Sequence, residues 1–315
     1  MFAPHPIVLQ LMNAPAPAGQ RELLTGVLLA AAGAIAFSCK AIIIKLAYRY
    51  DVDAVTTIMY RMLFAFPLFL ALSWWSGRNK PSPTAQDWRT LFGLGFCGYY
   101  LASYLDFAGL QYISANLERL ILYLNPTIVL LTGKLLFKTE VSRRQWLALG
   151  VSYIGVLIVF AHDLRAGADI ALGAILVFGS AVSYAIYLVY SGQIVRRLGA
   201  MRVTGLGTSI ACVLCIAQFF ILKPVSAMLV APEVIWLSAL NAVLCTFIPV
   251  LITMMALERI GAGITAQIGM IGPMSTIILS VLILGEPFTV WLALGTGLVV
   301  AGVWLLARYR IRPDS

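Results

Sequence analysis

Five charged side chains fall inside long apolar stretches of this sequence: Lys40, Arg61, Asp106, Glu118 and Arg119. A charge inside a bilayer is costly, so such residues usually pair with one another or line a path for ions or substrates. The basic groups could take a carboxylate or a phosphate, and the acids could take an amine or a proton. The alternative is that Lys40 and Arg61 extend to the membrane surface or form internal ion pairs.

The spacing of these residues decides which of them can share a helix face. Glu118 and Arg119 are adjacent, so about 100° of helix separates them. Glu118 is in register with Asn125, and we expect this polar stripe to face a cavity. We expect Arg119 to turn toward the preceding helix and to pair with Asp106. A further stripe at helical spacing consists of Tyr99, Ser103 and Asp106.

The elements that must position these residues are membrane helices. Of the 315 residues, 61% are apolar and 11% are charged, and the mean hydropathy is +0.93. A soluble domain carries about 25% charged residues, whereas runs of roughly 20 apolar residues can cross a bilayer as helices. We predict an all-α integral membrane protein with ten transmembrane helices, over residues 23–47, 54–75, 88–110, 115–137, 145–162, 170–192, 204–222, 234–257, 262–284 and 288–307.

The net charge of +9 reflects topology in this interpretation. If the N-terminus is cytoplasmic, most of the 22 Lys and Arg residues fall in cytoplasmic connections and in the C-terminal tail. We therefore expect both termini to be cytoplasmic, and we expect no nucleic-acid partner. All five cysteines lie within the expected spans, which favours packing over a redox role even for the Cys212 and Cys215 pair.

The sequence repeats itself at an offset of about 147 residues. The pentapeptide WLALG occurs at 146–150 and at 291–295, and Gly26 aligns with Gly173. Each half contains five expected spans, and this odd number inserts the second half upside down relative to the first. Inverted-topology repeats are typical of secondary transporters, which bind substrate near the midplane between the halves.

The two halves are expected to break at corresponding places. Pro126 and Pro273 interrupt the fourth and ninth spans, and each leaves a carbonyl one turn back without its usual partner. Such a break is either a packing kink or part of a site. The second half has no charge deep in a span, although Tyr187 aligns with Lys40. Its candidate cavity residues are Tyr184, Tyr187, Asn241, Thr265 and Gln267.

Two stretches resemble a known family: GLQYISANLERLILYLNPTIVLLTGKLLFKTEVSRRQWLALG and ALERIGAGITAQIGMIGPMSTIILSVLILGEPFTVWLALG. Both resemble the closing part of the EamA repeats in the drug/metabolite transporter superfamily. That pattern is a small-residue turn, an amphipathic span, a mid-helix proline, a Gly-Glu turn and a glycine-studded last helix. The second stretch has Gly285 and Glu286 at the turn, whereas the first departs there with Lys138, Thr139 and Glu140.

The resemblance covers nearly the whole chain and implies ten helices in a 5+5 inverted arrangement. It also implies a multi-pass protein of the cell inner membrane that exports or exchanges small metabolites. We accordingly expect a disordered N-terminal tail, two EamA repeats and a cytoplasmic C-terminal tail, over residues 1–21, 22–162, 163–308 and 309–315.

These features predict secondary active transport of a small polar metabolite by alternating access. An amino-acid-like or otherwise amphoteric substrate suits a site with both signs of charge, and Glu118 or Asp106 could carry a proton. The alternative is electroneutral exchange of organic anions, with Lys40 and Arg61 as the clamp. A membrane receptor or an enzyme is a remote alternative, because the sequence contains no HExxH, GxSxG or Walker A motif. We expect no cofactor and no metal. The expected partners are a small-molecule substrate, the lipid bilayer and, if transport is coupled, protons. The sequence leaves open whether the protein forms a homodimer.

Overall fold

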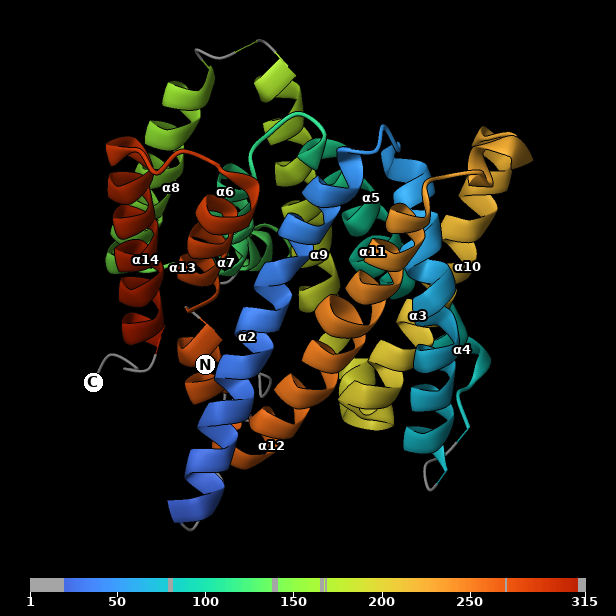
Figure 1. Ribbon diagram of the computed structural model, residues 1–315. Coiled ribbons are helices and arrows are strands. Elements are labelled where there is room, and N and C mark those ends of the chain that lie inside the picture. The colour runs from blue at the N-terminus through green and yellow to red at the C-terminus, as the bar shows by residue number, and fades with distance from the viewer. Residues whose placement is uncertain are drawn as a thin grey trace.

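The computed structural model describes residues 20–78, 82–137, 141–164, 167, 169–269 and 271–310. Glu140 and nearly all of the two expected tails lie outside this range. Within it the chain is helical and contains no strand (Figure 1). The α-helices are α2 (Gln20–Tyr48), α3 (Ala54–Gly77), α4 (Ala85–Gly95), α5 (Ala102–Leu110), α6 (Ala115–Leu122), α7 (Asn125–Phe137), α8 (Arg143–Asp163), α9 (Asp169–Leu198), α10 (Ala200–Leu222), α11 (Pro232–Ala242), α12 (Ile248–Gly269), α13 (Ile271–Leu279) and α14 (Val290–Arg310). Between them lie the π-helical segments η1 (Phe96–Leu101), η4 (Val243–Phe247) and η5 (Ser280–Leu284) and the 3₁₀ turn η3 (Val225–Met228).

The described part of the chain contains six helical stretches long and apolar enough to cross a membrane. They are Glu22–Tyr48, Ala54–Gly77, Arg143–Asp163, Asp169–Ser191, Ala200–Leu222 and Pro232–Thr253. Two shorter apolar helices are Met274–Leu284 and Val290–Leu306. The third and fourth expected spans are instead built from shorter segments, so the number of ten spans stays a prediction.

The expected connection between the eighth and ninth spans is absent from the described structure, because α12 runs through residues 258–261 without a break. In the first half, the Ser114 hydroxyl accepts a hydrogen bond from the Leu117 amide and so caps the start of α6. The residue that aligns with Ser114 in the second half is Gly261. Glycine has no side-chain oxygen that could cap a new helix, so nothing comparable separates the two spans there.

Irregular segments recur at the same offset as the sequence repeat. The π-helical segment η1 begins at Phe96, and η4 begins 147 residues later at Val243. The fourth expected span consists of two helices, α6 and α7, and Pro126 lies in the first turn of α7. Pro273 lies in the first turn of α13. Proline is tolerated at these places because the first turn of a helix needs no N–H partner.

The helices pack as expected for two halves related by a two-fold axis. Helix α3 packs against its repeat counterpart α10, and α8 packs against its counterpart α14. Helix α2 lies along α12 in the same way as α9 lies along α5. In Figure 1, α8 and α14 form one flank of the bundle, and α3, α4 and α10 form the opposite flank. Exchanging the halves therefore exchanges equivalent contacts.

Close helix crossings depend on glycines at equivalent positions. A side chain at Gly26 would collide with Ile260, and a side chain at Gly173 would collide with Ile113. Gly26 aligns with Gly173, and Ile113 aligns with Ile260, so these two contacts are repeat equivalents. Small residues allow membrane helices to approach closely enough for van der Waals packing to hold them together.

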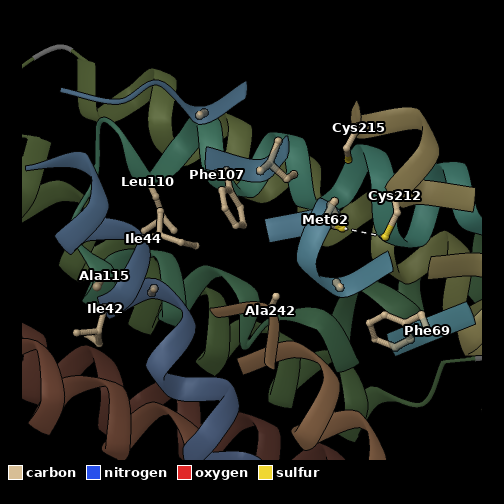
Figure 2. Packing of buried hydrophobic residues seen from close by; sticks show 14 of the residues in the cluster. Ile42, Ile44, Met62, Phe69, Phe107, Leu110, Ala115, Cys212, Cys215 and Ala242 are labelled. Atoms are coloured by element: carbon tan, nitrogen blue, oxygen red, sulfur yellow. Dashed lines mark hydrogen bonds between the residues drawn. The ribbon is translucent and has the colours of Figure 1, made fainter. Parts of the chain in front are cut away.

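A large apolar cluster lies where the first three helical spans meet the second half. Figure 2 shows Phe107 and Leu110 of α5 facing Ile44 of α2, with Met62 of α3 in contact with Cys212 of α10. Phe107 and Leu110 are fully buried. This cluster fixes the relative position of α2, α3 and α5, the helices that carry Lys40, Arg61 and Asp106.

Candidate functional site

A cavity of about 630 Å³ is lined by residues of both halves. Its volume is in the range of pockets that hold small molecules. Many of the residues singled out from the sequence line it, namely Lys40, Arg61, Tyr99, Ser103, Asp106, Arg119, Asn125, Tyr184, Tyr187 and Thr265. Glu118 and Asn241 are buried outside this lining, and the side chain of Gln267 lies outside the described residues.

Lys40 on α2 holds two buried carboxylates together. Its Nζ lies 2.5 Å from Asp106 Oδ2 on α5 and 3.1 Å from Glu118 Oε1 on α6. Glu118 is completely buried, and Asp106 is 3% exposed. The ammonium therefore ends inside the protein in an internal ion pair, and it does not extend to an end of the bundle. Asp106 Oδ1 and Glu118 Oε2 have no hydrogen-bond partner among the described residues, so each can accept a proton or a ligand donor.

The cavity-facing side of α6 differs from the expectation. Arg119 and Tyr123 line the cavity, whereas Glu118 faces Lys40 and does not line it. Asn125 does line the cavity, but not as a continuation of the Glu118 stripe. The reason is that α6 ends at Leu122 and α7 begins at Asn125, so the helical register that relates the two residues is interrupted.

The expected pair of Arg119 with Asp106 is also wrong. Arg119 Nε donates to Thr276 Oγ1 at 2.9 Å, and its Nη2 donates to the Phe37 carbonyl at 3.0 Å. Lys40 already occupies the Asp106 carboxylate, which removes the reason for an arginine to pair there. Arg119 is thus held in the cavity wall by neutral groups of α13 and α2.

Arg61 on α3 is held in the same manner. It is 7% exposed, its Nε donates to Thr246 Oγ1 at 3.0 Å, and its guanidinium carbon lies 5.1 Å from the centre of the Phe107 ring. Neither Arg61 nor Arg119 has a carboxylate within ion-pair distance among the described residues. Each keeps further N–H donors, because a guanidinium has five. Two cavity arginines are therefore available to an anionic group of a ligand.

Tyrosines form another wall of the cavity. The hydroxyls of Tyr99 on η1 and Tyr187 on α9 lie 2.9 Å apart, and their ring centres are 5.1 Å apart. The rings of Tyr184 and Tyr187 stack at 5.5 Å. Tyrosine rings offer an electron-rich face to apolar or cationic groups, and their hydroxyls offer hydrogen bonds.

Both helix breaks border the cavity. Pro126 has no N–H to give to the carbonyl of Leu122, and Pro273 has none for the carbonyl of Gly269. Leu122 and Gly269 both line the cavity. Both breaks thus border the same space as the charged residues.

The repeat makes the cavity strongly asymmetric in charge. Its ionised residues come from the first half, and the aligned positions of the second half carry hydroxyls. The counterparts of Lys40, Arg61, Asp106 and Glu118 are, in that order, Tyr187, Thr208, Thr253 and Thr265, and all four line the cavity. The two halves therefore share a backbone plan but not the same polar chemistry.

Several hydrogen bonds connect helices at the end of the bundle that carries the α2–α3 turn, named here the α2–α3 end (top of Figure 1). Tyr48 donates its hydroxyl to the Phe107 carbonyl at 2.7 Å, and Ser280 donates to Asn116 Oδ1 at 2.7 Å. Glu286 accepts from the amides at the start of α6, at 2.9 Å from Ala115 N. The Ser280–Asn116 and Glu286–Ala115 contacts join the first half to the second, whereas the Tyr48–Phe107 contact joins α2 to α5 within the first half.

Several residues of the site were not singled out from the sequence. Thr246 and Thr276 anchor the two arginines, and Thr204 and Thr208 lie in the wall near Tyr99. Threonines are common in membrane helices, so their type alone carries no signal. The repeat offered one clue, because Thr246 aligns with Tyr99. Among the described residues no group of three or more His, Cys, Asp or Glu side chains could hold a metal ion.

Comparison with known proteins identifies the chain. A profile of the EamA-like transporter family matches residues 24–161 and 171–308. An uncharacterized transporter of Bacillus subtilis, YcbK, is 29% identical over 88% of this chain and 91% of its own length. An uncharacterized transporter of Archaeoglobus fulgidus is 22% identical over 84% of this chain and 91% of its own. One solved structure, titled only as the crystal structure of a protein, aligns with a TM-score of 0.63 at 14% identity, over 92% of this chain and 99% of that one. The chain belongs to the EamA-like transporter family of the drug/metabolite transporter superfamily.

Proposed function

We propose that this EamA-like transporter moves a small amphoteric metabolite, amino-acid-like in its charged groups, across the cell inner membrane. Transport is secondary and active, and it proceeds by alternating access between the halves 22–162 and 163–308. Both termini are cytoplasmic in this proposal, as the distribution of Lys and Arg favours. The α2–α3 end then faces away from the cytoplasm.

The observation that carries the proposal is the charge arrangement of the cavity. Arg61 and Arg119 each bind a threonine of the second half and have no carboxylate partner among the described residues. A substrate carboxylate would supply the missing counter-charge with charge-assisted hydrogen bonds. Because each arginine connects the two halves, a substrate bound there would sense their relative movement.

The opposite charge of the substrate has acceptors in the same cavity. An ammonium group can contact the Asp106 carboxylate or the faces of Tyr184 and Tyr187. Asp106 and Glu118 share a single lysine, so one of the two carboxylates has a charge that Lys40 does not balance. A proton on either carboxyl would balance it, and this cluster is the proposed site of proton coupling.

Exchange of organic anions is the second candidate function. It is favoured by the excess of basic groups, since three basic residues face two acids in the cluster of Lys40, Arg61, Arg119, Asp106 and Glu118. Lys40 is occupied by both acids, so the clamp in this alternative is Arg61 with Arg119 and not Lys40 with Arg61.

Uptake into proteoliposomes tests both functions. Two labelled pools, amino acids and small carboxylate or phosphate anions, are supplied with and without an imposed pH gradient. Proton-coupled transport predicts amino-acid uptake that follows the gradient. The Glu118→Gln variant should lose gradient-driven uptake yet keep exchange of substrate for substrate, whereas Glu233→Gln, an exposed acid at the start of α11, should keep both. Gradient-driven uptake that survives Glu118→Gln would remove Glu118 as the proton carrier.

The arginine clamp has its own variant and control. Arg119→Gln should abolish uptake of any substrate bound through a carboxylate. Arg78→Gln should not, because Arg78 stacks on Trp74 at the end of α3 and does not line the cavity. Anion exchange that needs Arg119 but ignores the pH gradient would establish the second candidate function. Full uptake by Arg119→Gln would overturn the proposed binding mode.

A further inference from the structure

A second cavity, of about 580 Å³, lies at the α2–α3 end. The two cavities share no lining residue. The second is lined by the end of α2, the α2–α3 turn, the end of α5 and the segment after η5: Lys45, Tyr48, Arg49, Asp51, Val52, Asp53, Gln111, Leu284 and Glu286. It is named here the end cavity.

Two of the acids that line the end cavity are already engaged. Asp53 caps α3 by accepting from the amides of Val55 and Thr56, and its other oxygen lies 3.2 Å from Lys223 Nζ. Glu286 accepts from the first amides of α6. The partial positive charge of a helix N-terminus balances a carboxylate at such a position. Both acids therefore already have hydrogen-bond partners, although the carboxylate of Glu286 also attracts the ammonium of Lys45 at longer range.

The two bases of the end cavity have no carboxylate within ion-pair distance among the described residues. Lys45 is half-buried and has no hydrogen bond or ion pair among the described residues. Arg49 uses one nitrogen, Nη2, on the Leu284 carbonyl at 3.1 Å, and a carbonyl carries no net charge. Lys45 lies in the last turn of α2 and Arg49 directly follows the helix, four residues later, and both line the end cavity, so they can reach one ligand group together. This pair fits a carboxylate or a phosphate.

The third acid that lines the end cavity, Asp51, lies in an unusual turn between α2 and α3. Asp51 has φ 55°, and it is the only residue other than glycine with positive φ in the described part of the chain. Its carboxylate is exposed and has no partner among the described residues. The left-handed conformation costs free energy for a residue with a side chain, although Asp tolerates it better than most. The turn thus contributes an exposed carboxylate to the lining of the end cavity.

We propose that the end cavity is a second binding site, which holds a carboxylate or phosphate on Lys45 and Arg49 and an ammonium on Asp51. A free amphoteric solute and the head group of phosphatidylethanolamine both have this chemistry. The proposal concerns binding alone and does not depend on what the central cavity transports.

The test measures protection of a reporter cysteine. Gln111 is exposed and lines the end cavity, so a Gln111→Cys chain in a non-ionic maltoside detergent is labelled with a maleimide. The unsubstituted chain, whose five cysteines lie in the helical spans, sets the background. Glycine is the free probe, acetate is the anion without an ammonium, and nanodiscs of phosphatidylethanolamine supply the head group.

We expect glycine to slow labelling several-fold and at lower concentration than acetate. Adding Lys45→Gln with Arg49→Gln should weaken protection by about tenfold or more, as expected when charge-assisted hydrogen bonds are lost. Asp51→Asn preserves the turn, since Asn also adopts positive φ, and should remove the advantage of glycine over acetate. Arg119→Gln in the central cavity and Arg78→Gln outside both cavities should leave protection unchanged.

Each outcome decides the proposal. Protection in the nanodiscs, with no added effect of glycine, identifies the head group as the occupant and supports the site. Absence of protection by both probes overturns it, as does protection that survives Lys45→Gln with Arg49→Gln. Loss of protection in Arg119→Gln would assign the effect to the central cavity and would equally overturn the end cavity as a site.

Discussion

Replacing Lys40 by methionine removes the one cation within ion-pair distance of both Asp106 and Glu118 among the described residues. Methionine is unbranched and only one atom shorter than lysine, so the change is mainly one of charge. The side chains of Asp106 and Glu118 are 4% and 0% exposed, so neither carboxylate can be solvated without rearrangement. Breaking a buried ion pair by removing one partner costs about 3–5 kcal/mol. We expect the Lys40→Met chain to unfold roughly 10 °C below the unsubstituted chain.

The assay is thermal unfolding in detergent at neutral pH, with a compensated variant beside it. A triple variant that combines Lys40→Met, Asp106→Asn and Glu118→Gln has no buried charge at this place. It should recover most of the lost stability, because replacing a complete buried pair by neutral groups is often close to neutral. Lys134→Met is the matched control, since Lys134 is exposed and stacks over Trp146 at 4.8 Å. It should change stability by less than about 1 kcal/mol.

Two results would refute this reasoning. If Lys40→Met unfolds at the temperature of the unsubstituted chain, the carboxylates are not held by Lys40. If the triple variant is as unstable as Lys40→Met, the loss arises from packing around Lys40 rather than from unbalanced charge. Transport by Lys40→Met that matches the unsubstituted chain would further separate this ion cluster from proton coupling.

Three further predictions concern the contact between α8 and α14, the hydrogen bond between Ser280 and Asn116, and the cap residue Asp53 at the start of α3. Gly155→Leu should destabilise the α8–α14 contact by about 1–3 kcal/mol or more, because a Cβ there would lie 2.6 Å from the Gly295 carbonyl oxygen. A Cβ at Gly150 on the same helix would meet nothing within 4 Å, so Gly150→Leu should have little effect in the same unfolding assay. Asn116→Ala breaks the 2.7 Å hydrogen bond from Ser280 and should cost about 1–3 kcal/mol; a cycle with Ser280→Ala should show coupling, and strictly additive losses would contradict the bond. At Asp53, burial works against the charged form, but hydrogen bonds from Thr56 and the ammonium of Lys223 outweigh it and hold the pKa of Asp53 below its ordinary value of 3.8. The lowered pKa of Asp53 stabilises the folded protein above pH 3.8, and this contribution is lost as the pH falls from there through the pKa of the folded state. Asp53→Asn keeps the helix cap, so it should lower stability by less than about 1 kcal/mol at pH 7 and match the unsubstituted chain in acid. A deficit that persists in acid would assign the loss to the cap.

Sequence patterns located the charged residues of the cavity but not their partners. Lys40, Asp106 and Arg119 were recognisable because a charge in an apolar span is rare, and all three line the cavity. The pairing of Arg119 with Asp106 was wrong, since α2 brings Lys40 to the carboxylate first. Sequence spacing describes one helix at a time, whereas an ion pair depends on which helices are neighbours.

The same limit explains the misplaced face of Glu118. Helical spacing holds only while the helix is continuous, and the break between α6 and α7 removes the relation between Glu118 and Asn125. The threonines that anchor Arg61 and Arg119 carried no signal of their own, because a hydroxyl in a membrane helix bonds to its own backbone as readily as to a partner.

The sequence by itself determined the helical membrane class, the internal repeat and the family, because apolar runs and a regular offset are properties of the chain read in order. It also determined where the prolines interrupt the repeat. Only the tertiary structure decided that Lys40 lies between two acids, and that two arginines are held by threonines with no carboxylate at ion-pair distance among the described residues. These facts arise from contacts between helices far apart in the chain, and their free energy depends on distance and burial that no linear pattern encodes.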